Sequence, residues 1–172
     1  MPDLVIALTK RPDGDVVLRC TRADGSATWQ RHRGGRAAFF PLHDLTHYAV
    51  ESELGVRRGF FGLIVEGWDI GDTDGKSPRG PLPPDAIAVE DLVGAMDLQR
   101  ASGTRWSAPD LNEQAAARAA RDGRPAPQPL TDEDLARLRA RWHDLLRQWT
   151  DLPGGGTLEL VFDRSITTHA AS

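Results

Sequence analysis

Two histidines four residues apart, His43 and His47, lie in the segment FFPLHDLTHYAVESELG, residues 39–55. Asp44 follows the first histidine directly, and Glu51 lies four residues after the second. Residues at this spacing lie one turn apart on the same face of an α-helix, so both imidazoles could bind one metal ion. Zinc enzymes use this arrangement, with a third protein ligand and a water molecule completing the site. The segment therefore predicts a metal site, and zinc is the expected ion.

Glu51 is not expected to bind the same ion as both histidines. In a helix its Cα lies about 12 Å along the axis from that of His43. We expect Glu51 to orient His47 instead, by accepting a hydrogen bond from the ring nitrogen that does not face the metal.

The third ligand is expected to be Glu66, in the apolar segment FFGLIVEGWDI. A carboxylate buried in such a segment needs a partner, and a metal cation would provide one. An ion pair with Arg57 or Arg58 is the alternative explanation for Glu66. Four other residues are weaker candidates for the third ligand: Asp69, Asp72, Asp74 and His32.

The sequence HDLTHYAVE resembles the H-E-L-T-H helix of thermolysin-type zincin metallopeptidases, with Asp44 where those enzymes have glutamate. The resemblance implies a helix that follows an antiparallel sheet, and a glutamate ligand about twenty residues downstream, which corresponds to Glu66. It also implies that Asp44 is the catalytic base of a metal-dependent hydrolase that activates the attacking water. The segment is similar as well to small bacterial proteins with an HDLxHYxVE sequence, which are uncharacterised and imply no activity.

A second hypothesis assigns no metal to these residues. Two imidazoles at the edge of a core could bind backbone groups or the neighbouring carboxylates, and Asp44 in a first helical turn would favour the helix dipole. The protein would then be a non-catalytic binding or interaction module.

The rest of the chain predicts an α+β fold. Three β-rich runs separated by turns indicate a three-stranded antiparallel meander over residues 3–33, and GGGTLELVFD indicates a C-terminal strand that returns to it. About five helices are expected between these strands, with Pro41 in the first turn of the first helix and residues 71–85 as a long loop. The expected helices cover residues 41–55, 56–70, 86–102, 107–123 and 130–152.

Length and composition predict one domain, residues 1–164, followed by a disordered tail, residues 165–172. The formal net charge of -4 makes nucleic acid an unlikely partner, although five arginines between residues 31 and 58 could form a basic patch. The only cysteine, Cys20, is expected in the core. No segment has the roughly 20 apolar residues of a membrane-spanning helix, so we expect a cytoplasmic protein. The substrate or other small-molecule or peptide partner and the oligomeric state are not predicted.

Overall fold

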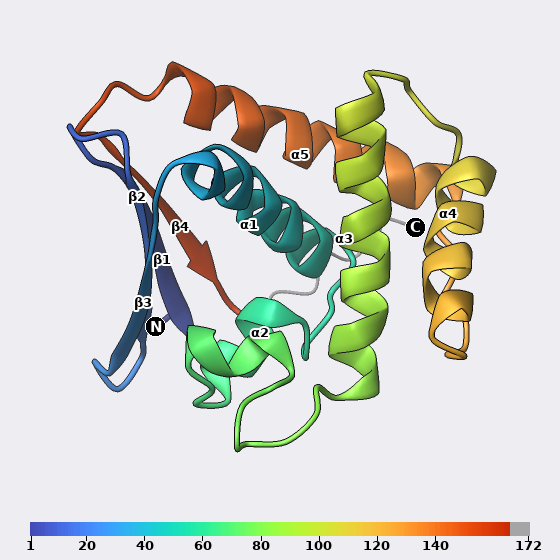
Figure 1. The fold of residues 1–172 in the computed structure, drawn as a ribbon, viewed down its shortest axis with the longest axis horizontal. Helices are drawn as coiled ribbons and strands as arrows, with labels where there is room; N and C mark the ends of the chain where they lie inside the picture. Colours follow the sequence, from blue (N-terminus) through green and yellow to red (C-terminus); the bar gives the residue numbers. More distant parts are fainter. Residues whose placement is uncertain (166–172) are drawn as a thin grey trace.

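The structure is a computed structural model that describes residues 1–165 (Figure 1). Apart from Ser165, the expected C-terminal tail lies outside the described residues. The predicted α+β class is confirmed: a four-stranded antiparallel sheet packs against helices on one side.

The sheet contains the predicted meander and the returning strand. Its strands are β1 (Leu4–Lys10), β2 (Val16–Arg22), β3 (Ala27–His32) and β4 (Thr157–Phe162), in the order β3-β2-β1-β4. Apolar residues alternate along the strands, so one face is buried, and Leu8 lies opposite both Leu18 and Leu158. Cys20 is on this face and is fully buried, as expected.

The first helix, α1 (Gly35–Glu53), begins earlier than predicted. Pro41 lies inside the helix and not in its first turn. Because proline has no backbone N–H, it cannot donate the helical hydrogen bond to the carbonyl of Ala37. The run from Asp44 to Glu51 is buried on every side, because α1 packs between the sheet and the helices α3 and α5. The histidines are therefore on a central helix of the fold.

The remaining helices form the layers beyond α1 (Figure 1). α3 crosses α1, α5 runs along it, and α4 packs on the outer side of α3. The capping boxes of α4 and α5 are present, with Ser107 and Thr131 as N-caps, which confirms both predicted helix starts. Trp142 of α5 donates from Nε1 to Thr46 Oγ1 of α1 at 2.9 Å, a buried hydrogen bond between two helices. The bounds are α3, Pro84–Ser102; α4, Ala108–Arg121; α5, Asp132–Asp151.

The segment between α1 and α3 is less helical than predicted. α2 covers only Phe60–Val65, because the chain turns at Gly67, where φ is 90°. A short 3₁₀ helix, η1 (Ile70–Asp74), follows, and turns lead to α3. Ile70 N–H donates to Thr28 Oγ1 of β3 at 3.1 Å, so η1 is attached to the sheet. Within residues 1–165, no helix is both long and apolar enough to cross a lipid bilayer.

Candidate metal centre

His43 and His47 lie side by side on α1, as their spacing requires. The centroids of the two imidazole rings are 4.8 Å apart, and the ring planes are inclined at 78°. His47 is almost completely buried, whereas His43 is partly exposed. The two rings therefore lie at the boundary between the buried core and the solvent-accessible surface.

His43 is held by a carboxylate of another helix. Its Nδ1 lies 2.6 Å from Oδ2 of Asp97 on α3, and Arg100 donates to Oδ1 of the same carboxylate at 3.1 Å. A carboxylate at Nδ1 favours the tautomer that carries its proton there. Nε2 of His43 is then the nitrogen available to a metal ion.

His47 lies between two carboxylates. Its Nδ1 is 3.4 Å from Oε1 of Glu51, and its Nε2 is 3.0 Å from Oε1 of Glu90 on α3. Neither ring nitrogen makes a hydrogen bond of regular geometry, although both are buried. Burial alone would lower the pKa of His47, but the charge of Glu90 and the hydrogen-bonding position of Glu51 raise it to about 10. Without a metal, His47 is therefore a cation shared by two acids.

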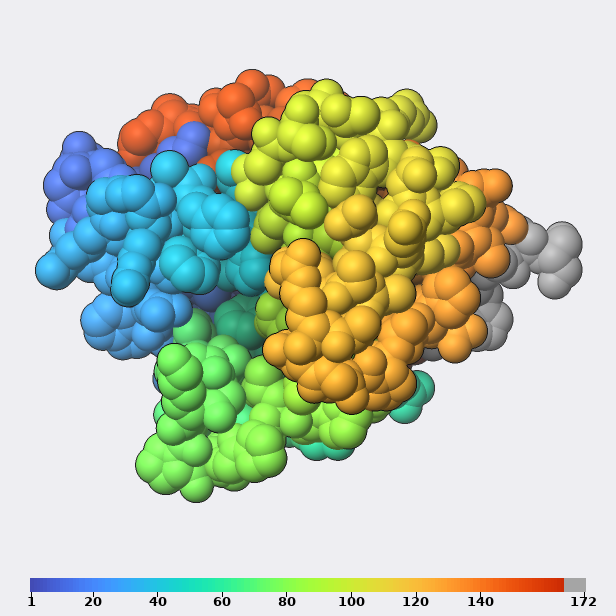
Figure 2. Space-filling view, turned by 45° about the vertical axis from the view of Figure 1, so that its right-hand side comes forward, coloured from blue at the N-terminus to red at the C-terminus, as the bar shows by residue number. Residues whose placement is uncertain are grey.

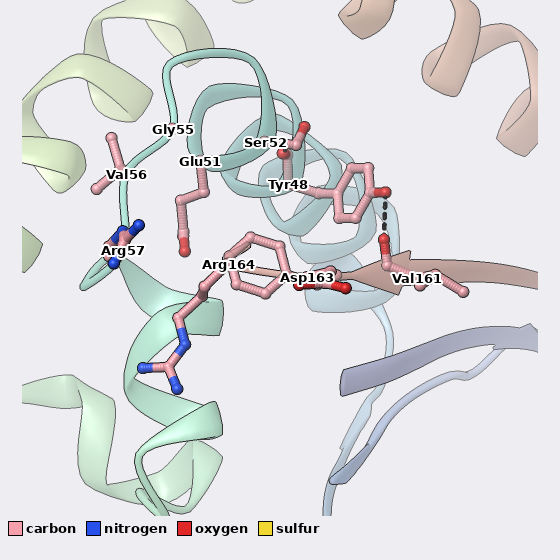
Figure 3. Close-up of a pocket in the computed structure, with 10 residues that line it drawn as sticks. Tyr48, Glu51, Ser52, Gly55, Val56, Arg57, Val161, Asp163 and Arg164 are labelled. Atoms are coloured by element: carbon pink, nitrogen blue, oxygen red, sulfur yellow. Dashed lines mark hydrogen bonds between the residues drawn. The ribbon is translucent and has the colours of Figure 1, made fainter. Parts of the chain in front are cut away.

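Glu51 also binds the backbone of α2. Its Oε1 accepts from Phe61 N–H at 3.3 Å and its Oε2 accepts from Gly62 N–H at 3.1 Å, two amides of the first helical turn. This approach requires Gly59, because a Cβ atom there would lie 2.3 Å from the carboxyl carbon of Glu51. Figure 3 shows the Glu51 side chain extending away from α1 toward the segment that leads into α2. The two backbone amides of α2 therefore hold the Glu51 carboxylate in its position beside His47.

A second contact near this position joins α1 to β4. Tyr48 donates from its hydroxyl to the carbonyl of Val161 at 2.8 Å, as Figure 3 also shows.

Three residues form the one group in the described chain that could hold a metal ion: His43, His47 and Glu90. One nitrogen or oxygen atom from each lies within 4.8 Å of the other two. We call these residues the triad. Two imidazoles and a carboxylate are ligands that zinc accepts.

Glu66, the predicted third ligand, is not in the triad. It is exposed, and its carboxylate binds Arg58 Nε at 3.0 Å, with Arg164 Nη1 at 3.8 Å. The reason is the shortness of α2: the helix ends before Glu66, and the turn at Gly67 directs the chain outward. The ion pair with Arg58 was the alternative explanation, and the structure supports it in place of a metal ligand.

Asp44 lies in the same cavity as the triad, next to His32 at the end of β3. Oδ2 of Asp44 and Nε2 of His32 are 3.9 Å apart, and each is buried without a hydrogen-bond partner. Burial raises the pKa of the Asp44 carboxyl to about 7, although His43 and His47 act to lower it. Burial, together with the charge of Arg36, lowers the pKa of His32. His32 is therefore neutral at neutral pH, and Asp44 is close to its titration midpoint.

The triad and Asp44 open into a cavity of about 450 Å³. Side chains from β3, α1, α2, η1 and α3 line it, so it lies where the sheet, the central helix and the outer helices meet. Figure 2 shows the molecular surface hollowed between the light-blue and cyan part of the chain and the green part. A small molecule entering here would contact the triad directly.

No protein-family model, curated protein or solved structure matches the chain. What the site can do is therefore inferred from its own geometry. The histidine pair lies on a helix that follows an antiparallel sheet, and the carboxylate grouped with it is Glu90, not the predicted Glu66.

Sequence reasoning missed Glu90 and Asp97, which both come from α3. A signal was present: the two acids are seven residues apart, about two helical turns, in the largely apolar stretch AVEDLVGAMDLQ, whose third acid is Asp91. That spacing places both on one face of the helix, but it does not say which helix that face meets.

Proposed function

We propose that the triad binds one divalent metal ion, with zinc as the ion that fits its ligands best. The observation that carries the proposal is the convergence of His43, His47 and Glu90 from two helices to within 4.8 Å. Ligand atoms of a tetrahedral zinc site are about 3.3 Å apart, given bonds of about 2.0 Å. His47 Nε2 and Glu90 Oε1 are already 3.0 Å apart, so small side-chain movements would complete the geometry.

The surrounding carboxylates support this assignment. With Asp97 at Nδ1 of His43 and Glu51 at Nδ1 of His47, Nε2 is on both rings the nitrogen that would bind the metal. Metal-binding histidines usually have such a carboxylate or carbonyl partner, which fixes the ring and increases its basicity. The role predicted for Glu51 is therefore part of the proposal, and Asp97 takes the equivalent role for His43.

We further propose that the centre is of the catalytic type, in a metal-dependent hydrolase. Structural zinc sites are closed by four protein ligands, whereas catalytic sites have three and an open position. The triad supplies three ligands beside a cavity. A divalent ion held there would act as a Lewis acid on an oxygen atom of the substrate.

Asp44 is the proposed general base. It lines the cavity beside both histidines, and in the metal-free protein burial raises its pKa to about 7, within the range used for proton transfer at neutral pH. Its role would be to take a proton from the attacking water and to return it to the leaving group. His32, neutral and 3.9 Å away, limits the directions in which the carboxylate can rotate.

One observation favours a second function, that of a non-catalytic module. His47 as a cation between Glu51 and Glu90 joins α1, α2 and α3 without any metal. In that case the three residues stabilise the packing of the helices, and added zinc would leave the stability of the protein unchanged.

Zinc content separates the two functions. Metal-free protein is given a small excess of zinc, unbound metal is removed, and bound zinc is measured by mass spectrometry. We expect about one equivalent in the wild type, loss of tight binding in His47→Ala and Glu90→Gln, and no loss in Glu66→Gln. Circular dichroism checks that each variant is folded. The thermal melt of the wild type should rise with zinc, because a ligand that binds only the folded state stabilises it. A wild type without bound zinc, whose melt ignores the metal, would contradict the proposal.

A further inference from the structure

The walls of the cavity beside the triad differ in chemistry from one side to the other. Four apolar side chains form one part: Phe40, Phe60, Ile70 and Leu82. The Phe60 ring lies 5.3 Å from that of His47, and the Phe40 ring 6.0 Å from that of His43. An apolar group placed between these rings would therefore be directly beside the metal position.

The charged residues that line the cavity are all acidic or histidine. Asp44, Asp74 and Glu90 contribute carboxylates, and no lysine or arginine is among the lining residues that the structure describes. A divalent cation would balance the charges of Glu90 and Asp44, but the charge of Asp74 would remain. Any ligand that reaches Asp74 therefore meets a negative potential.

Asp74 is available to a ligand at the edge of the cavity. It is exposed at the end of η1, and one of its oxygens accepts a hydrogen bond from the backbone N–H of Lys76 at 2.8 Å. Among the ion pairs of residues 1–165, none includes Asp74, whereas the neighbouring Asp72 binds Ser77 and Arg79. The backbone contact fixes the direction of the Asp74 carboxylate without cancelling its charge.

We propose that this cavity selects small ligands with three features: an oxygen donor for the metal, an apolar body, and a far end that is neutral or positively charged. The proposal rests on the metal site of the proposed function and adds the class of substrate. A volume of about 450 Å³ suits one aromatic ring with short substituents. Molecules with a carboxylate or phosphate at the far end are excluded by Asp74, since no cation lines the cavity to receive them.

The test uses cobalt as a visible probe of the metal and hydroxamates as ligands of known charge. Protein loaded with Co²⁺ is titrated with acetohydroxamate, benzohydroxamate, 4-carboxybenzohydroxamate and 4-(aminomethyl)benzohydroxamate, and binding is followed by the visible cobalt spectrum. We expect benzohydroxamate to bind about tenfold more tightly than acetohydroxamate, because the phenyl group leaves water. The aminomethyl compound should bind about tenfold more tightly than the carboxy compound.

A charge variant tests the role of Asp74 directly. In Asp74→Asn, the aminomethyl and carboxy compounds should bind with similar affinity, and the cobalt spectrum without ligand should be unchanged. Asp85→Asn removes a charge outside this cavity and should retain the wild-type preference. The inference is overturned if the carboxy compound binds the wild type as tightly as the aminomethyl compound does. It is also overturned if benzohydroxamate binds no more tightly than acetohydroxamate. If no cobalt spectrum develops, the metal site itself is absent, and both the proposed function and this inference fail.

Discussion

Nδ1 of His43 lies 2.6 Å from Oδ2 of Asp97, so a residue of α1 is oriented by a residue of α3. Arg100 binds the other oxygen of the same carboxylate, which holds Asp97 in place. The arrangement of the triad therefore depends on the contact between two helices that are far apart in sequence.

Removal of the Asp97 carboxylate should weaken metal binding without removing a ligand. In Asp97→Asn, His43 loses the acceptor that fixes its tautomer, and we expect zinc affinity to fall about 10- to 100-fold. Competition with a fluorescent chelator measures this affinity. Asp85→Asn, on the first turn of the same helix, is the matched control and should bind zinc as the wild type does. Equal affinity in both variants would exclude a role for Asp97.

Zinc binding should release a proton from His47. Glu90 and Glu51 raise the pKa of His47 to about 10 despite its burial, so the ring is protonated in the metal-free protein at neutral pH. The metal binds only the neutral ring. At pH values below the pKa of His47, the apparent zinc affinity should therefore increase about tenfold for each unit by which the pH is raised. Calorimetry in buffers with different ionisation enthalpies counts the released protons. Affinity that is independent of pH between about pH 7 and 9 would show that zinc binding releases no proton from His47.

Asp44→Asn should stabilise the metal-free protein at high pH. Burial raises the pKa of Asp44 from 3.8 to about 7, so the folded state binds this proton more tightly than the unfolded chain. Stability is therefore lost as the pH rises through that interval. We expect the variant to gain on the order of 2 kcal/mol in unfolding free energy at about pH 8.

The same variant should show no gain at about pH 4, where the carboxyl is largely protonated in both states. Urea denaturation at the two pH values measures the difference. A loss of stability at the higher pH would mean that the Asp44 carboxylate has a stabilising partner. Hydrolytic activity, once a substrate is found, should disappear in this variant because the proposed base is removed. A gain in stability with a loss of activity is the usual trade-off at an active-site residue.

Gly59→Ala should affect the metal site through Glu51. The new Cβ atom would lie 2.3 Å from the carboxyl carbon of Glu51, which must leave the amides of α2 and its position beside His47. We expect a loss of about 1–3 kcal/mol in stability, typical of a lost buried hydrogen-bond acceptor, and weaker zinc binding. Gly154→Ala is the control, because nothing lies within 4 Å of a Cβ atom there. If both variants bind zinc equally well, Glu51 does not support His47.

Local patterns predicted most of the fold. Three β-rich runs separated by turns predicted the meander, and the helices expected at 107–123 and 130–152 are α4 and α5. The predicted start of α1 and both predicted ends of α2 were wrong. Gly34 is the N-cap of α1, and the helix is stabilised by the run from Asp44 to Glu51, which is buried on every side. Tertiary packing outweighed the local signal.

The candidate site was predicted only as far as one helix determines it. His43, Asp44, His47 and Glu51 have positions set by the helical repeat, so their mutual placement followed from the sequence. Glu90 and Asp97 reach the site through the packing of α3 on α1, which depends on side chains along both helices.

Glu66 illustrates the opposite error. It was expected in a buried helix because the preceding residues are apolar, yet one glycine turn placed it at the surface beside Arg58.

The position of β1 between β2 and β4 has a consequence for biosynthesis. The strand that completes the sheet, β4, is made after every helix, and its Leu158, Leu160 and Phe162 are part of the core. On a ribosome, α1 would rest on an incomplete sheet until residue 162 has emerged. The α1 side of the triad would therefore gain the full support of the sheet only after β4 has paired with β1.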